Sequence, residues 1–229
     1  MVYAVSDLHG CYEKYIQMLE IIHFNKKDTL YVLGDVVDRG PGGIRILQHM
    51  RKHGNILPLR GNHDVLAASL LKKLSDPANL RSRKLVELCG LWFEDGGRET
   101  YRAFTALSRE EKADLLKYMD SFFIYEEIIV NGRNFFLSHT VPGKEKMLNF
   151  DSCRWEDFVM GEPDYEETYY EDRCLVTGHT PTGFIEESFA GRIWKKNRHI
   201  AIDCGAVFGN PLGCICLDTL EEFYAEGES

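Results

Sequence analysis

Metal-binding side chains recur in five short groups along this sequence of 229 residues. Three groups lie in the first third of the chain, and two isolated histidines follow in later segments. Carboxylate oxygens, amide oxygens and imidazole nitrogens are ligands that divalent metal ions take from proteins. The groups together offer enough ligands for two ions, namely Asp7, His9, Asp35, Asn62, His139 and His179.

The spacing of these residues indicates how two ions would be shared. Asp7 and His9 are two positions apart and precede Gly10, so a sharp turn there would bring both to one ion. Asp35 has two carboxylate oxygens and can bridge two ions. The mixed oxygen and nitrogen set favours manganese, iron or zinc over calcium, with manganese expected first, and no cysteine belongs to it. Two ions sharing a water molecule would lower its pKa and supply a hydroxide nucleophile.

Other polar residues beside these groups are suited to acid catalysis and phosphate binding. His63 could protonate a leaving oxygen while Asp38 holds its other nitrogen. Arg39 could grip phosphate oxygens through paired donors. Arg60 could also bind phosphate, but we expect it instead to pair with a carboxylate near the site. Any one of these residues is more often a surface or capping residue, but the complete set indicates a two-metal phosphoesterase.

The polar groups follow apolar segments that have the pattern of buried strands. Each of these strands ends just before a polar group, and we expect them at residues 2–5, 29–33 and 56–59. Helical periodicity between them predicts helices at residues 11–22 and 41–53. Alternating strands and helices are typical of a parallel sheet, which binds ligands at the C-terminal ends of its strands.

The second half of the chain has a different pattern. Residues 65–122 are expected to be mainly helical, and Ser108 with Glu111 fits a capping box. Short strands follow, and Asn131-Gly132 between two of them indicates a hairpin. These strands are expected at residues 123–130, 135–138, 174–177, 200–203 and 213–218. We therefore expect an α/β fold in one domain over residues 1–229, with His139 and His179 again at strand ends.

The composition limits the classes of function. The net charge is −9 and no long basic tract occurs, so high-affinity nucleic-acid binding is not expected. Seven cysteines without a disulfide-framework spacing indicate reduced thiols and a cytoplasmic protein. The first motif follows Met1 too closely to leave room for a signal peptide, and no apolar stretch is long enough to span a membrane.

The ordered motifs resemble those of the phosphoprotein phosphatase family of metallophosphoesterases, in particular its bacterial branch. That branch includes serine/threonine protein phosphatases and symmetrical dinucleoside tetraphosphatases. The resemblance runs from Val2 to about Asp218 and is most specific at Gly34–Gly40 read with Arg60–Asp64. Further likeness lies in Trp92, in Gly96, Gly97 and Thr100, in Gly178–Pro181 and in Ile202–Gly209.

The resemblance implies a four-layer sandwich of two mixed β-sheets flanked by helices. It also implies that Asp7, His9 and Asp35 hold one metal, and that the second is held by Asp35, Asn62, His139 and His179. His63 with Asp38 would be the acid pair, and Arg39 would clamp phosphate. Relatives often carry a second phosphate-binding arginine in a Trp-x-Arg segment. Here that arginine is displaced, and Arg154 is its candidate replacement.

Two smaller departures from the family pattern concern Ser6 and Asp64. Ser6 replaces the usual glycine before Asp7, and Asp64 stands where eukaryotic relatives usually have glutamate, although aspartate is familiar in bacterial relatives.

The first expectation for the substrate is a phosphomonoester, most of all phosphoserine or phosphothreonine in a protein or peptide. The mechanism expected is direct attack by metal-bound hydroxide, without a phosphoenzyme. The enzymatic alternative is a dinucleoside polyphosphate such as diadenosine tetraphosphate. A non-catalytic metal-binding scaffold is less expected, because a scaffold needs no acid pair. The sequence leaves the oligomeric state open.

The acidic, aromatic stretch Trp155–Asp172 has two interpretations. It is either an ordinary solvated surface over packed aromatic rings or a cap that repels polyanions and attracts basic peptides.

Overall fold

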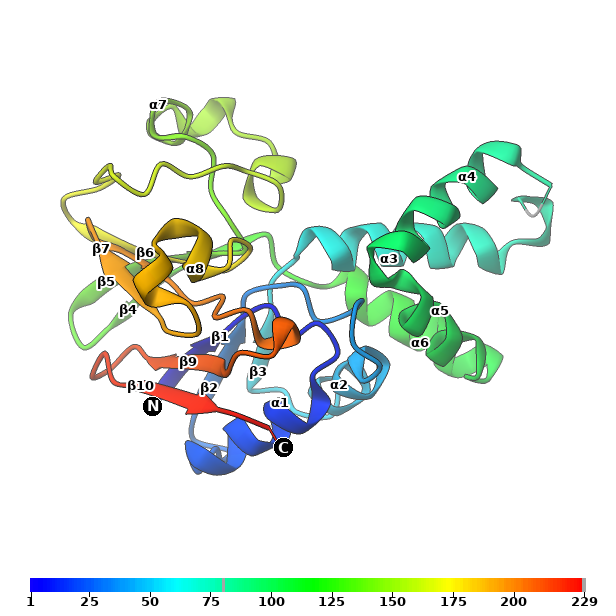
Figure 1. The fold of residues 1–229 in the computed structure, drawn as a ribbon, viewed down its shortest axis with the longest axis horizontal. Helices are drawn as coiled ribbons and strands as arrows, with labels where there is room; N and C mark the ends of the chain where they lie inside the picture. Colours follow the sequence, from blue (N-terminus) through cyan, green and yellow to red (C-terminus); the bar gives the residue numbers. More distant parts are fainter. Residues whose placement is uncertain (80, 228–229) are drawn as a thin grey trace.

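The computed structural model describes residues 1–79 and 81–227, which form two mixed β-sheets with helices outside them (Figure 1). Each sheet has three adjacent parallel strands and two strands that pair antiparallel. The expected fold of two mixed sheets flanked by helices is confirmed.

The first sheet has the order β10-β9-β1-β2-β3. Its strands are β1 (Val2–Val5), β2 (Thr29–Val32), β3 (Ile56–Pro58), β9 (Leu212–Cys216) and β10 (Glu222–Ala225). Strands β1, β2 and β3 run parallel, as the sequence pattern predicted, whereas β9 pairs antiparallel with β1. The edge strand β10 was not predicted, because it is short and only half-buried along most of its length.

The second sheet has the order β4-β5-β6-β8-β7. Its strands are β4 (Tyr125–Val130), β5 (Arg133–Ser138), β6 (Arg173–Thr177), β7 (Trp194–Lys196) and β8 (His199–Ala201). The predicted hairpin joins β4 to β5, and its two turn residues Asn131 and Gly132 have φ of 48° and 76°. Strand β7 was not predicted from the sequence.

Helices α1 (Tyr12–Ile21) and α2 (Gly43–Met50) lie beside the first sheet (Figure 1). The predicted helical segment extends to one side of the sandwich as α3 (Asn62–Ser75), η1 (Pro77–Asn79), α4 (Arg83–Trp92), η2 (Phe93–Gly97), α5 (Arg98–Thr105) and α6 (Arg109–Asp120). The capping box of α6 is confirmed, since Glu111 N–H donates to Ser108 Oγ and Ser108 N–H to Glu111 Oε2.

Short helices complete the fold. They are α7 (Lys144–Leu148), η3 (Phe150–Ser152), η4 (Trp155–Phe158), α8 (Thr182–Ile185), η5 (Glu187–Phe189) and η6 (Ala206–Phe208). None of the helices within residues 1–79 and 81–227 combines the length and apolar character of a membrane span.

The apolar core has three parts, and two of them enclose the first sheet. Leu33, Leu137 and Ile215 belong to a cluster contributed by both sheets. A larger cluster joins the other face of the first sheet to α1, α2 and the helical segment. The third, around Phe136 and Phe158, contains apolar residues of the second sheet and of η4. Burial on both faces makes the central strands rigid supports for the loops that follow them.

Candidate metal centre

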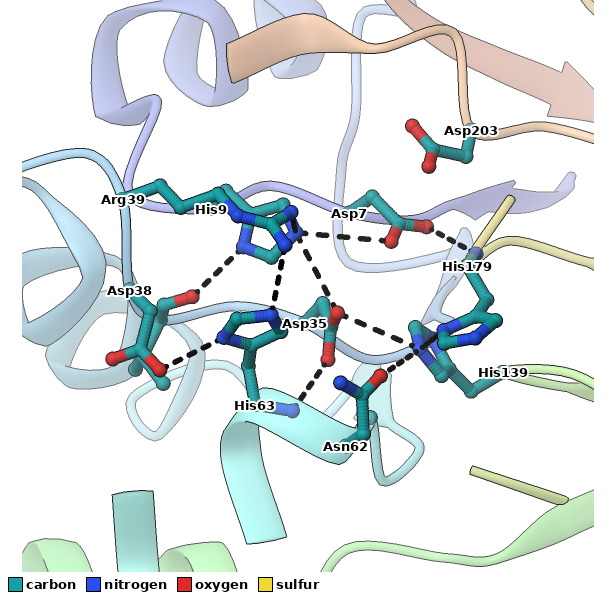
Figure 2. A network of polar contacts seen from close by, with 12 residues as sticks. Asp7, His9, Asp35, Asp38, Arg39, Asn62, His63, His139, His179 and Asp203 are labelled. Atoms are coloured by element: carbon teal, nitrogen blue, oxygen red, sulfur yellow. Dashed lines mark hydrogen bonds and ion pairs between the residues drawn. The ribbon is translucent and has the colours of Figure 1, made fainter. Parts of the chain in front are cut away.

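Polar side chains from both sheets meet just beyond the C-terminal ends of the six parallel strands. Asp7, Asp35 and Asn62 follow β1, β2 and β3. His139, His179 and Asp203 follow β5, β6 and β8 in the same way. Figure 2 shows most of these side chains converging on a small region, with Asp35 near its middle.

The backbone at the site is held in a conformation that most residues avoid. Six site residues have positive φ, namely Asp7 (52°), His9 (39°), Asp35 (53°), Asp38 (70°), Arg39 (66°) and His179 (69°). Each such position costs on the order of 1–3 kcal/mol, and it persists only where surrounding contacts enforce it. Neighbouring loops supply these contacts, because Asp7 N–H donates to Gly34 O and His9 N–H donates to Asp35 O, at 3.1 and 2.8 Å.

Two glycines allow main chain to approach the carboxylates. A Cβ atom on Gly61 would lie 2.1 Å from Asp35 Oδ1, and one on Gly178 would lie 2.1 Å from Asp7 Oδ2. Both distances are far below van der Waals contact, so neither position accepts a side chain without moving the carboxylate.

One group of possible ligands contains His9, Asp35 and Asp7. The Nδ1 atom of His9 lies 3.0 Å from Val37 O, so it carries the proton and leaves the lone pair on Nε2. That Nε2 atom lies 3.5 Å from Asp35 Oδ2 and 4.0 Å from Asp7 Oδ1. The second oxygen of Asp7 accepts the main-chain N–H of His179 at 2.9 Å, which orients the carboxylate.

A second group surrounds His139. Its Nδ1 atom lies 2.7 Å from Leu33 O and therefore donates, so Nε2 carries a lone pair. This lone pair faces Asn62 Oδ1 at 3.0 Å, His179 Nδ1 at 3.0 Å and Asp35 Oδ2 at 3.5 Å. Neither Asp35 Oδ2 nor Asn62 Oδ1 offers a proton to it, and His179 Nδ1 donates only in the tautomer that carries its proton there. In the other tautomer all four atoms are acceptors, and a cation would resolve their convergence.

The distances fit ions bound by these residues. Two ligands of one ion, each about 2.0–2.2 Å from it, lie about 3–4 Å apart. The separations of His9 Nε2 and of His139 Nε2 from their neighbours, from 3.0 to 4.0 Å, fall in that range. Asp35 Oδ2 belongs to both groups, while Asp35 Oδ1 accepts the main-chain N–H of His63 at 3.0 Å (Figure 2). Asp35 is thus positioned to be a ligand of both ions.

Burial shifts the pKa values of the carboxylates upward. Loss of solvation, then the charge of Asp35, raises the pKa of Asp7 to about 8. Loss of solvation also raises the pKa of Asp35 to about 6 and that of Asp203 well above its usual range, with Asp7 adding to the effect on Asp203. Buried carboxylates of this kind require a counter-charge to ionise, and bound cations provide one.

Burial shifts the imidazole pKa values downward. Desolvation lowers the pKa of His9 to about 2 and the pKa values of His139 and His179 to about 3. All three histidines are therefore neutral across the physiological range, which is the form that binds metal.

A separate chain of hydrogen bonds supports His63. Its Nδ1 atom donates to Asp38 Oδ2 at 2.9 Å, and Trp92 Nε1 donates to the same oxygen at 2.8 Å. The hydroxyl of Thr100 donates to Asp38 Oδ1 at 2.7 Å, and it accepts the Asp38 main-chain N–H at 2.9 Å. Burial lowers the pKa of His63, but the bond to Asp38 and the charge of Asp35 outweigh this, so the net shift is upward.

Arg39 lies between the His9 group and His63. Its Nη1 atom is 2.7 Å from His9 Nε2, and its Nη2 atom is 3.0 Å from His63 Nε2. The carboxylate of Asp95 approaches Nη2 at 3.6 Å, and Gly96 O accepts the Arg39 main-chain N–H at 3.0 Å. An ion and Arg39 cannot use the same lone pair of His9, so an ion bound there would displace Nη1.

Two predicted arginines lie outside this network. Arg154 is exposed, and its side chain makes no hydrogen bond or ion pair with any residue that the structure describes. Arg60 donates to the carbonyl oxygens of Phe122 and Asp120, each at 3.0 Å, so its pairing is with main chain rather than with the expected carboxylate. Asp64, the other departure, accepts N–H groups of Gly61 and Val36 and so braces the Asp35 loop.

Sequence reasoning missed two carboxylates at the site. Asp203 could have been found, because it follows β8 by two residues, as Asp7 follows β1. Asp95 has no comparable signal. It is an exposed residue of the helical segment, and only the packing of η2 brings it within 3.7 Å of His63 Nε2.

Comparison with known proteins identifies a family. The family profile described as calcineurin-like phosphoesterase matches residues 1–206. A symmetrical bis(5′-nucleosyl)-tetraphosphatase of Methylobacillus flagellatus is 37% identical over 70 residues, which are 30% of this chain and 25% of that protein. The corresponding protein of Chromobacterium violaceum is 41% identical over 66 residues, covering 28% and 24%. The matched segment thus spans about a quarter of these curated relatives.

Solved structures share the fold. A provisionally assigned diadenosine tetraphosphatase superposes with a TM-score of 0.70 at 18% identity, covering 100% of this chain and 94% of that one. A serine/threonine phosphatase of Saccharomyces cerevisiae superposes with a TM-score of 0.59 at 13% identity, covering 100% and 80%. At these identities the likeness establishes the architecture alone.

Proposed function

The chain belongs to the calcineurin-like phosphoesterase family, and we propose that it is a two-metal hydrolase of dinucleoside polyphosphates. Hydrolysis of phosphoester-type bonds is the activity of the family. The narrower choice of substrate follows from the curated relatives, which are symmetrical bis(5′-nucleosyl)-tetraphosphatases. A dinucleoside polyphosphate was the alternative substrate expected from the sequence. It is now preferred to phosphoserine and phosphothreonine proteins, which were the first expectation.

The observation that carries the two-metal proposal is the position of Asp35 Oδ2, 3.5 Å from both His9 Nε2 and His139 Nε2. We assign one ion to Asp7, His9 and Asp35. The other ion is assigned to Asp35, Asn62, His139 and His179. Two bound divalent ions neutralise phosphate charge and lower the pKa of an attacking water molecule.

We assign the proton transfer to His63. Asp38 accepts from His63 Nδ1, so Nε2 is the atom that would deliver a proton to the leaving oxygen. The hydrogen bond to Asp38 and the charge of Asp35 raise the pKa of His63, which favours its protonated form. For a symmetrical tetraphosphate, water attacks one central phosphorus, the central P–O bond breaks, and the leaving nucleoside diphosphate takes the proton.

Arg39 is assigned to the phosphate chain. Its guanidinium already contacts the nitrogens of His9 and His63, so a phosphate oxygen placed between the metal ligands and the acid would fall within its reach. Arg154 stays a prediction for a second phosphate contact.

A phosphopeptide remains the second candidate substrate, because of the acidic stretch Trp155–Asp172. Its carboxylates other than Asp157 are exposed, and Lys144 pairs with Glu167 at 2.7 Å. Exposed carboxylates attract basic peptides and repel polyphosphates at low ionic strength.

The experiment is a substrate panel with manganese-reconstituted enzyme. Diadenosine tetraphosphate, a basic phosphoserine peptide and an aryl phosphate are compared by kcat/KM, with the Asp35→Asn variant as a control for contaminating activity. We expect the highest value for diadenosine tetraphosphate and ADP as its product. A higher value for the phosphopeptide would replace the first candidate by the second.

A further inference from the structure

An exposed aromatic ring lies beside the arginine assigned to phosphate. Phe208 is 62% exposed, and its ring centroid is 5.5 Å from the guanidinium carbon of Arg39. The same guanidinium contacts His9 and His63. Phe208 is therefore a large apolar side chain beside site residues that are charged or polar.

The turn that carries Phe208 is tied to the rest of the fold. It runs through η6 between Gly205 and Gly209, which have φ of 77° and 94°. Lys14 Nζ on α1 donates to Ala206 O at 2.9 Å and to Asn210 O at 2.5 Å. These bonds hold both ends of the turn, so Phe208 is presented in a fixed position rather than on a free loop.

Asp203 gives the turn a further link to the metal-ligand region. It is 5% exposed, and its Oδ1 atom accepts the main-chain N–H of Gly205 at 2.9 Å. Its charge interacts with that of Asp7, and Figure 2 shows both carboxylates on the same side of the site. The start of the Phe208 turn is thus positioned relative to the metal ligands.

We propose that Phe208 is a stacking platform for a nucleobase of the substrate whose phosphate chain lies on Arg39. In a dinucleoside tetraphosphate the base is separated from the attacked central phosphate by one further phosphate and a ribose. It would therefore reach the exposed edge of the site, where Phe208 lies. Stacking on an aromatic face is tolerant of base identity, since every base has a π-face. The preference is therefore for nucleotides over base-free phosphates, rather than for one base. This inference rests on the proposed function and adds to it the residue that recognises the base.

The test uses two substitutions at position 208. Phe208→Leu removes the aromatic face and keeps an apolar side chain, whereas Phe208→Tyr keeps the face and is the matched control. Each enzyme, loaded with manganese, is measured on diadenosine tetraphosphate and on base-free tripolyphosphate. Stacking is worth about 1–3 kcal/mol per base. The kcat/KM for diadenosine tetraphosphate divided by that for tripolyphosphate should therefore fall about 5- to 150-fold in Phe208→Leu. Phe208→Tyr should keep the wild-type ratio.

Two results would overturn the stacking role while leaving the proposed function intact. One is an unchanged ratio in Phe208→Leu with strong wild-type activity on diadenosine tetraphosphate. The other is an equal loss in both variants, which would mean that the ring supports the turn and not a base.

Competition separates this inference from the choice of substrate. The inhibition constants of ADP and of pyrophosphate are measured during hydrolysis of the phosphoserine peptide. In Phe208→Leu the inhibition constant of ADP should rise relative to that of pyrophosphate by a similar factor. If the wild type hydrolyses only phosphopeptides, the proposed function fails. If Phe208→Leu then has the wild-type ratio of inhibition constants for ADP and pyrophosphate, the stacking role fails as well.

Discussion

The indole nitrogen of Trp92 donates a 2.8 Å hydrogen bond to Asp38 Oδ2, the same oxygen that binds His63. Both Trp92 and Asp38 are buried, with 1% and 0% of their surface exposed. A residue of the helical segment thereby holds the partner of the proposed acid.

Trp92→Phe should lower kcat without removing metal. The substitution keeps most of the ring volume but removes one donor from the buried Asp38 carboxylate, which then holds His63 less firmly. Loss of this bond should also reduce the free energy of unfolding by about 1–3 kcal/mol. Urea denaturation, kcat on diadenosine tetraphosphate and metal content by atomic absorption check the prediction. Wild-type turnover in this variant would mean that Trp92 has a packing role only.

Asp35→Asn should abolish activity and lower metal content in both groups, because one carboxylate oxygen faces His9 and His139 alike. In the wild type, manganese at 100 times its dissociation constant should stabilise the fold by about 2.7 kcal/mol for each bound ion. The variant should show a much smaller gain. Thermal unfolding with and without manganese measures this difference. Two tightly bound ions in Asp35→Asn would contradict the shared-ligand assignment.

His63→Ala should reduce kcat by about 10²- to 10⁴-fold on phosphoserine peptides, whose alkoxide leaving group needs a proton. The loss should be smaller on an activated aryl phosphate, because that leaving group departs without protonation. Parallel kinetics on the two substrates test the difference. Equal losses would instead assign His63 to support of the neighbouring ligand Asn62.

Asp38→Asn should move the alkaline limb of the pH profile to lower pH. The proposed acid works in its protonated form, so activity falls as pH rises through the pKa of His63. Asp38 contributes to raising that pKa, and its removal therefore lowers the pH at which the proton is lost. The pH dependence of kcat/KM for wild type and variant measures the shift. An unchanged alkaline limb would show that it reports another group.

Gly61→Ala should impair metal binding and should also lower the stability of the fold. The added Cβ would lie 2.1 Å from Asp35 Oδ1 and 2.2 Å from the Asp35 main-chain nitrogen, so it would displace both the carboxylate and the loop that carries it. Gly54→Ala is a matched control, because a Cβ there meets nothing within 4 Å. Manganese titration followed by thermal shift compares the two variants, and similar manganese affinities would show that Asp35 tolerates the displacement.

The convergence of the polar side chains at the site was largely predictable because their positions are encoded locally. Asp7, Asp35 and Asn62 lie within a few residues of strands whose apolar runs are visible in the sequence, and parallel strands bring their C-terminal ends to one edge. His139 and His179 follow the same logic in the second sheet. The capping box at Ser108 and the hairpin at Asn131 were predictable for the same reason, since both depend on neighbouring residues.

Other features depend on tertiary packing. Trp92 and Asp38 are 54 positions apart, and only the path of the helical segment brings the indole to the carboxylate. Likewise, the position of Phe208 beside Arg39 depends on Lys14 holding the turn from another helix. The net charge of −9 describes the whole chain and could not show which charged or aromatic side chains lie beside the proposed metal ligands. Local sequence specifies strands and ligand types, whereas contacts between distant segments are decided by how the sheets and helices pack together.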